Sequence, residues 1–245
     1  MIKSFRDWQI LESESQVNRS QFLTTKEEIE QWLEDNVSIK GEYVINDDMT
    51  VDVKGDVGIK NKSIKKIEVK FNEVSGYFYC SYCKSLTSLE GAPETVGGYF
   101  DCGSCTSLKT LEGAPETVGG YFSCGSCTSL KTLEGAPETV GGYFSCGYCT
   151  SLKSLEGISM KIEGRIYLHE TPFSDFEEVL NDNKTLLPLY AIGFTKDNYK
   201  EPEMQEKLKT LGIEHKVSWS ILDSYILDKN IGGSRRSMAK LKKGF

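Results

Sequence analysis

The central part of the chain repeats itself every 22 residues. Residues 91–112, 113–134 and 135–156 are nearly identical, each running from GAPETVGGYF through a Cys-x-x-Cys pair to SLKTLE or SLKSLE. A divergent copy, GYFYCSYCKSLTSLE, precedes them at residues 76–90, and a degenerate one, GRIYLHETPF, follows at residues 164–173. Because so short a unit cannot bury its apolar side alone, repeats of this length stack into a solenoid in which each unit packs against its neighbours.

A single unit shows how the stack is expected to form. Phe122 and Cys124 alternate with polar or small residues, which is the period of a strand with one buried side. Leu130 and Leu133 lie three positions apart, so both can turn back into the same core. Residues 134–137, Glu-Gly-Ala-Pro, have the composition of a turn. Each unit therefore predicts one short strand followed by an irregular return segment.

The repeats resemble the cysteine variant of the leucine-rich repeat, LxxLxLxxCxxL. Phe122 takes the second Leu position, Cys124 the third, Cys127 the Asn/Cys position and Leu130 the last, whereas Gly119 replaces the first Leu. The likeness covers roughly residues 55–175. It implies a single parallel sheet on the concave side of an arc.

A second resemblance is looser. The segment TKEEIEQWLEDNVSIKGEYVINDDMTVDVKGDV at residues 25–57, followed by the SLEGAPETVGGYF repeats, is similar to phage-encoded leucine-rich repeat proteins. Most of those have no assigned function. This resemblance implies a viral origin and no particular activity.

The flanking sequences predict an α+β chain in which caps close a leucine-rich repeat solenoid. We expect an N-terminal cap over residues 1–54, with a helix that Thr25 opens through a capping box and a hairpin around residues 46–48. The solenoid follows over residues 55–173. Residues 174–230 predict an α-rich C-terminal cap or small domain, with helices at 175–180 and 202–211 and a helix or strand at 219–227, and residues 231–245 form a basic tail.

The eight cysteines all fall within the repeats, as four Cys-x-x-Cys pairs. Such pairs are typical of zinc sites, so a metal-binding or redox module built on this array is one hypothesis. The repeat pattern favours another reading, because each cysteine takes a position that faces the core. Cys124 then fills space, and Cys127 offers its thiol to backbone groups at the turn. We therefore predict no metal and no cofactor, with free thiols in two buried ladders.

The outward side chains of the repeats form a surface rich in Tyr and Ser, with Tyr77, Tyr99, Tyr121 and Tyr143 expected to stack as a column. Antibody paratopes have a similar composition, since rigid Tyr side chains supply contact area at low entropic cost. The column can also serve only to stabilise the sheet. The predicted partner-binding residues are Tyr77, Tyr79, Tyr82, Tyr99, Asp101, Ser104, Tyr121, Ser123, Ser126, Tyr143, Ser145, Tyr148 and Tyr167.

The sequence gives little support for catalysis. Only two histidines are present, and no Ser/His/Asp order, HExxH or phosphate-binding GxxxxGK[ST] motif occurs. We therefore predict no catalytic residues and a chain that is not an enzyme, while an enzyme in the C-terminal part stays a further hypothesis. The chain start lacks the apolar core of a signal peptide, which favours the cytoplasm, or the host cytoplasm for a viral protein.

The hypothesis we favour is a non-enzymatic scaffold, phage-encoded, that binds a host protein through its Tyr/Ser face. By analogy its role is to inhibit a host defence or regulatory factor. A regulator that mimics or associates with nucleic acid is an alternative, since the net charge is −7 and the tail is basic. Membrane contact is not expected, and the oligomeric state stays open. The tail residues that could contact nucleic acid are Arg235, Arg236, Lys240, Lys242 and Lys243.

Overall fold

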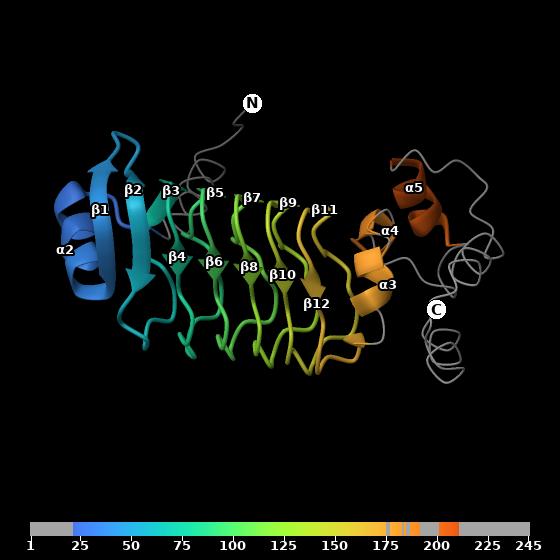
Figure 1. Cartoon of the computed structure of the whole chain (residues 1–245). Coiled ribbons are helices and arrows are strands. Elements are labelled where there is room, and N and C mark those ends of the chain that lie inside the picture. Colours follow the sequence, from blue (N-terminus) through green and yellow to red (C-terminus); the bar gives the residue numbers. More distant parts are fainter. Residues whose placement is uncertain (1–21, 175–176, 183, 185–186, 192–200, 211–245) are drawn as a thin grey trace, which may run out of the picture.

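The structure is a computed structural model of the chain, and it describes residues 22–174, 177–182, 184, 187–191 and 201–210. The described residues form a parallel β-solenoid with short helices at its two ends (Figure 1). The elements are α2 (Lys26–Asn36), β1 (Val37–Ile45), β2 (Thr50–Ile59), β3 (Lys70–Val74), β4 (Phe78–Tyr79), β5 (Thr95–Val96), β6 (Phe100–Asp101), β7 (Thr117–Val118), β8 (Phe122–Ser123), β9 (Thr139–Val140), β10 (Phe144–Ser145), β11 (Lys161–Ile162), β12 (Ile166–Tyr167), α3 (Glu177–Asp182), α4 (Leu187–Ala191) and α5 (Pro202–Thr210).

Each turn of the solenoid contributes one strand divided into two halves. A Gly-Gly pair divides it in the three central turns, and Ser75-Gly76 and Glu163-Gly164 take this place in the first and last turns. Both halves pair in parallel with the equivalent halves of the next turn, so that Thr95 lies beside Thr117 and Phe100 beside Phe122. Hydrogen bonding continues across the break, where the backbone N–H of Gly120 donates to the Gly98 carbonyl of the preceding turn at 2.8 Å. The 22-residue sequence repeat is therefore one turn of the structure, as predicted.

The N-terminal hairpin and the solenoid share one 12-stranded sheet within the described residues. Strand β2 pairs antiparallel with β1 along one edge. Along its other edge, its first half pairs with β3 and its second half with β4, both in parallel. Because β2 runs through position 54, the hairpin continues directly into the solenoid. The two strands of the hairpin flank the turn predicted around residues 46–48.

The core consists of stacked columns of identical side chains. Phe100, Phe122 and Phe144 are fully buried, with successive ring centroids 5.6 and 5.4 Å apart. The equivalent cysteines and leucines of each turn are buried above one another in the same way. One position differs from the leucine-rich repeat alignment: Gly119 is exposed, and Val118 fills the core instead. The apolar residue therefore precedes Phe122 by four positions, because the strand bends between them.

Helix α2 begins as the sequence predicts. The Thr25 hydroxyl accepts a hydrogen bond from the Glu28 backbone N–H at 3.2 Å, and Ile29, Trp32 and Leu33 form its buried stripe. The Glu28 carboxylate accepts from the backbone N–H of Thr24 rather than that of Thr25, at 3.4 Å. The second hydrogen bond of the capping box, from the backbone to the Glu28 side chain, therefore starts one residue before Thr25.

At the other end, α3 lies against β12 (Figure 1). The Asn181 side chain donates to the Ile166 carbonyl at 2.8 Å and accepts from the Ile166 N–H at 2.7 Å. The Glu177 carboxylate accepts from the Leu168 N–H at 2.6 Å. These contacts satisfy backbone groups that a last strand leaves unpaired. The predicted element at 219–227 and the basic tail lie outside the described residues.

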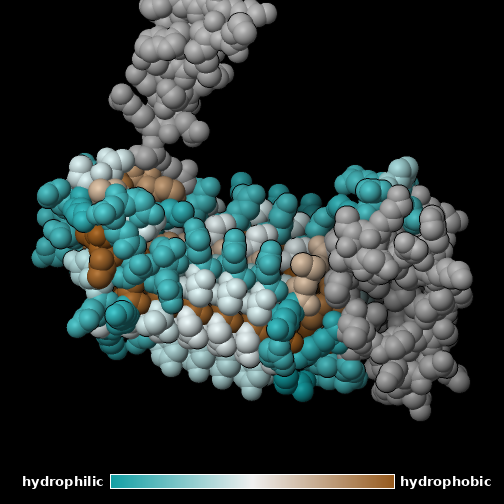
Figure 2. Space-filling model, turned by 90° about the horizontal axis from the view of Figure 1, so that it is seen from above, coloured by the Kyte–Doolittle hydropathy of each residue, from teal (hydrophilic) through white to brown (hydrophobic). Residues whose placement is uncertain are grey.

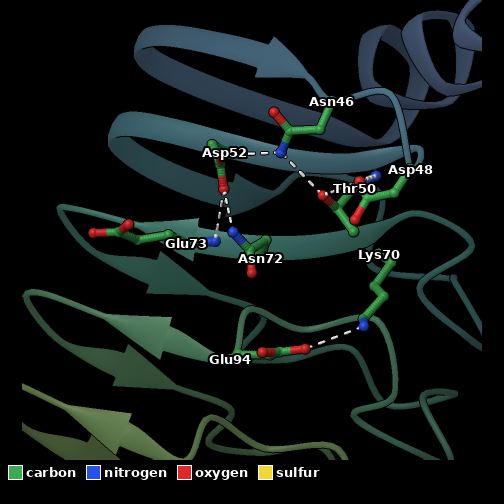
Figure 3. A network of polar contacts seen from close by, with 8 residues as sticks. All are labelled: Asn46, Asp48, Thr50, Asp52, Lys70, Asn72, Glu73 and Glu94. Carbon is green, nitrogen blue, oxygen red and sulfur yellow. Dashed lines mark hydrogen bonds and ion pairs between the residues drawn. The ribbon is translucent and has the colours of Figure 1, made fainter.

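A polar network ties the hairpin to the first solenoid turn (Figure 3). The Asp52 carboxylate accepts hydrogen bonds from the side chain of Asn46 at 2.9 Å, the side chain of Asn72 at 2.8 Å and the backbone N–H of Glu73 at 3.2 Å. The hydrogen bond from Asn46, with those from Asn72 and Glu73, lowers the pKa of Asp52. Since Asn46 precedes β2 and Asn72 belongs to β3, one carboxylate fixes three segments.

Candidate functional site

The candidate site is the side of the sheet that faces away from the core, which we call the sheet face. It consists of three columns that run along the solenoid, one residue from each turn. The tyrosine column is Tyr77, Tyr99, Tyr121 and Tyr143. The strand column is Tyr79, Asp101, Ser123, Ser145 and Tyr167. The turn column is Tyr82, Ser104, Ser126 and Tyr148.

The rings of the tyrosine column stack on one another, as the sequence predicts. Successive ring centroids from Tyr77 to Tyr143 lie 4.5, 4.2 and 4.7 Å apart, with interplanar angles of 13°, 1° and 9°. Tyr167 ends the stack with an edge-to-face contact at 5.6 Å. Tyr121 and Tyr143 remain 40% exposed, so the column is both packed and accessible. A hydrogen bond with Tyr99 also raises the pKa of Tyr121.

The second glycine of each Gly-Gly pair makes the stack possible. A Cβ atom at Gly120 would lie 2.4 Å from the Tyr99 ring of the preceding turn, and one at Gly142 would lie 2.6 Å from the Tyr121 ring. Any larger residue would displace the ring it touches. The Gly-Gly pairs thus provide the space for the tyrosine column.

The strand column is half-buried and changes character along the solenoid. Its two ends are aromatic, Tyr79 and Tyr167, while Ser123 and Ser145 lie between them. Asp101 is the one charged member, and its carboxylate accepts from the backbone N–H of Gly103 at 2.8 Å. Burial raises the pKa of Tyr79. This column therefore offers hydroxyl groups in its centre and rings at its ends.

The turn column lies at the border of the sheet face, after each strand has ended. Tyr82, Ser104, Ser126 and Tyr148 all have left-handed backbone conformations, with φ between 60° and 63°. This conformation is uncommon for residues other than glycine, and no local sequence pattern predicts it at these positions. Tyr82 and Tyr148 are 63% and 51% exposed, and Tyr148 makes an edge-to-face contact with His169 at 5.1 Å. The turns thus project one tyrosine ring outward at each end of the column.

Together the three columns give a rigid surface of rings, hydroxyls and backbone with one carboxylate. The side chains of Glu94, Glu116 and Glu138 are exposed at the turns and lie outside the three columns. Figure 2, which looks down on the solenoid, shows hydrophilic side chains recurring at regular intervals, with residues of intermediate hydropathy between them. Strongly hydrophobic residues show there as a narrow strip along the repeats and as a patch at the end formed by α2 and β1. A surface of this kind can bind a partner through aromatic contacts and hydrogen bonds.

The cysteines take no part in this surface, since all eight are buried free thiols. The second cysteine of a pair donates its thiol to the carbonyl of the first cysteine in the preceding turn. These bonds run from Cys105 to Cys80 at 3.2 Å, from Cys127 to Cys102 at 3.3 Å and from Cys149 to Cys124 at 3.1 Å. The role predicted for Cys127 is thereby confirmed.

Burial raises the pKa of Cys83 to about 11 and holds that of Cys146 well above its ordinary value. A hydrogen bond with the first cysteine of the preceding turn lowers the pKa of Cys105 and Cys149. The thiolate is the form that ligates metals and attacks electrophiles, so the environment of Cys83 and Cys146 opposes both. Among the described residues, no three His, Cys, Asp or Glu side chains are grouped so as to hold a metal ion.

His169 is exposed beside Tyr148, and the basic residues Arg235 to Lys243 lie outside the described residues. No helix in the described ranges has the length and apolar character needed to cross a membrane.

The fold defines a repeat protein of the parallel β-solenoid class with turns of 22 residues. Comparison with protein-family models gives no match, and searches of curated proteins and of solved structures give none either. The function is therefore inferred from the molecule itself.

Proposed function

We propose that this protein is a non-enzymatic scaffold that binds another protein through its sheet face. The observation that carries the proposal is the stacked tyrosine column, in which Tyr121 and Tyr143 are each 40% exposed. Rings held between two neighbours lose little freedom when a partner covers them, so binding costs less conformational entropy. Tyr is also among the residues that dominate binding energy at protein interfaces.

The solenoid is further proposed to be a leucine-rich repeat of the cysteine variant. Phe122 and Cys124 face the core from the strand, as the pattern requires. The thiol of Cys127 bonds a backbone carbonyl of the preceding turn, which is the role expected of that position. The place of Val118 is the departure from the pattern.

The end elements are proposed to act as caps. At the C-terminal end, Asn181 and Glu177 hydrogen-bond the backbone of β12. At the N-terminal end, Trp32 and Leu33 of α2 bury apolar surface of the first rungs. A solenoid needs such ends because a bare terminal turn exposes its core.

The origin and partner follow from resemblance alone. On that basis we propose a phage-encoded protein whose partner is a host protein, with inhibition of a defence or regulatory factor as its effect.

The test is quantitative capture of partners on the immobilised full chain from host lysate, read by mass spectrometry. The Tyr121→Ala/Tyr143→Ala variant should lose the captured protein, because it removes the exposed centre of the tyrosine column. A matched Lys131→Ala/Lys153→Ala variant, which changes exposed side chains outside the strands, should retain it. The captured protein is then titrated against both variants to measure the loss in affinity.

Loss of folding must be separated from loss of contact. Far-UV circular dichroism and thermal melts are recorded for each variant, and Val118→Ala provides a control that lowers stability from the core while leaving the sheet face intact. Capture that survives the double tyrosine change, or that is lost equally in Val118→Ala, rules out the sheet face as the binding surface.

A further inference from the structure

The two ends of the sheet differ in how the backbone of the edge strand is hydrogen-bonded. At the β12 end, Asn181 and Glu177 occupy backbone groups of the last strand. At the opposite end, β1 pairs with β2 along one edge only. Within the described residues, therefore, β1 pairs with no strand along its other edge, and it is the outermost strand at that end of the sheet, with α2 beside it (Figure 1).

The pairing of β1 with β2 fixes which backbone groups face outward. The Asn46 N–H donates to the Thr50 carbonyl, and β1 keeps this register throughout, so its even-numbered residues share hydrogen bonds with β2. The odd-numbered residues Ile39, Gly41 and Tyr43 direct their N–H and C=O groups away from β2. No backbone hydrogen bond joins these outward groups to any other described residue.

The middle of β1 is exposed on both of its faces as well as along this edge. The five consecutive residues from Lys40 to Val44 are all exposed, including Tyr43 at 41% and Val44 at 60%. Since neighbouring residues point to opposite faces of a strand, α2 does not cover this stretch on either side. An open edge with exposed apolar side chains is a site for adding another strand.

We propose that β1 pairs with β1 of a second copy of this chain, in antiparallel orientation about Gly41, to form a two-fold symmetric dimer. The outward groups of β1 can pair only odd-numbered residues with odd-numbered residues, and the symmetric registers that pair most of the strand are centred on residue 40, 41 or 42. A centre at 40 places Lys40 opposite Lys40 of the second copy, and a centre at 42 places Glu42 opposite Glu42. The centre at 41 places Lys40 opposite Glu42 twice, so charge selects it.

The selected register extends a charge pattern that the hairpin already contains. In the hairpin, Lys40 lies opposite Asp56, and Glu42 lies opposite Lys54. Across the proposed interface, the signs would alternate through four strands, from Asp56 and Lys40 of one copy to Glu42 and Lys54 of the other. On the opposite face, Ile39 meets Tyr43 of the second copy and buries part of its ring.

Charged residues on an edge strand usually prevent indiscriminate pairing. Here Lys40 and Glu42 would reject most strands and the two alternative registers, yet complement a second β1. The symmetry axis would stand perpendicular to the sheet, so the sheet faces of both copies would point in the same direction. If the proposed function holds, the dimer offers two tyrosine columns to one partner assembly.

The first experiment measures the mass of the full chain by sedimentation velocity and light scattering. The wild type should be a dimer, while Lys40→Glu and Glu42→Lys each place two like charges together at the interface and should raise the dimer dissociation constant about ten-fold or more. Mixing the two variants restores opposite charges in both contacts, so a heterodimer should form. Far-UV circular dichroism of each variant checks that the hairpin change has not unfolded the chain.

A second experiment keeps Lys40 and Glu42 and tests the register. In the proposed register Ser38 lies opposite Val44 of the second copy, at the spacing of a pair that a disulfide can join. Ser38→Cys mixed with Val44→Cys should cross-link under oxidised glutathione, whereas either variant alone should not. The eight native thiols are buried and give no background.

A wild-type chain that stays monomeric at the highest concentration measured would overturn the proposal. So would single charge reversals that remain fully dimeric, or a cross-link that forms equally well in Ser38→Cys alone. None of these readouts depends on a binding partner, so they separate the dimer from the proposed function.

Discussion

Removal of the Cys127 thiol tests whether the buried sulfurs do more than fill space. Cys127 is fully buried, and its thiol is the donor to the Cys102 carbonyl at 3.3 Å. Cys127→Ala removes one buried heavy atom, which costs about 1 to 1.5 kcal/mol in packing. It also leaves the carbonyl without this donor, which adds about 1 kcal/mol, the lower end of the range because a thiol is a weak donor.

The matched control is Cys83→Ala. Cys83 occupies the same repeat position in the first turn and is also fully buried, but its thiol has no hydrogen-bond acceptor within the described residues. This variant should therefore lose only the packing contribution. We expect Cys127→Ala to cost about 2 to 2.5 kcal/mol and Cys83→Ala about 1 kcal/mol less.

The assay is urea and thermal unfolding followed by far-UV circular dichroism under reducing conditions. For a chain of this size, 1 kcal/mol shifts the Tm by roughly 2 to 4 °C, so Cys127→Ala should melt about 4 to 10 °C below the wild type. Equal losses in the two variants would refute the reasoning, because the thiol-to-carbonyl bond would then contribute nothing.

Three further predictions concern the backbone, the polar network and the C-terminal edge. Ser126→Val should lower the unfolding free energy by about 1 to 2 kcal/mol, because a β-branched residue resists the left-handed conformation at φ 60°, whereas Ser126→Gly should not lower it. Hydrogen bonds lower the pKa of Asp52 below its ordinary 3.8, so as the pH falls the unfolded chain binds the proton before the folded chain does. The stability that Asp52 contributes should therefore persist above pH 3.8 and be lost as the pH falls through the lower pKa of the folded state. Acid titrations of the unfolding free energy should show a shallower fall in Asp52→Ala than in the wild type. Asn181→Ala leaves the N–H and C=O of Ile166 without their side-chain partner and should cost about 1 to 3 kcal/mol in urea unfolding, with normal stability if that contact is immaterial.

The 22-residue repeat predicts most of the fold from the sequence alone. A fixed 22-residue period allows only in-register stacking, so Phe122 and Cys124 could be placed inward and Tyr121 outward by alternation alone. The tyrosine column followed because identical residues in register must lie side by side. The thiol bond of Cys127 followed from the position it takes in the pattern.

Features that depend on contacts between distant residues were missed. The bend at Gly119 moves the core position to Val118, and no local pattern indicates how far a Gly-Gly pair will turn the chain. The middle of β1 lacks any alternation of apolar residues, so only its pairing with β2 defines it as a strand. The left-handed conformation of Ser126 is set by the turn around it, and serine gives no sequence signal for that conformation.

The identity of successive turns has a consequence for the length of the molecule. Each turn bonds only to the one before and the one after, and residues 91–112 and 113–134 present nearly the same surfaces to both. Insertion or deletion of a whole 22-residue module would therefore join matching surfaces, shifting the ends apart or together by one strand spacing, about 4.8 Å. The number of turns, and with it the length of the solenoid, can therefore change while the structure of each turn and of the two end regions stays the same.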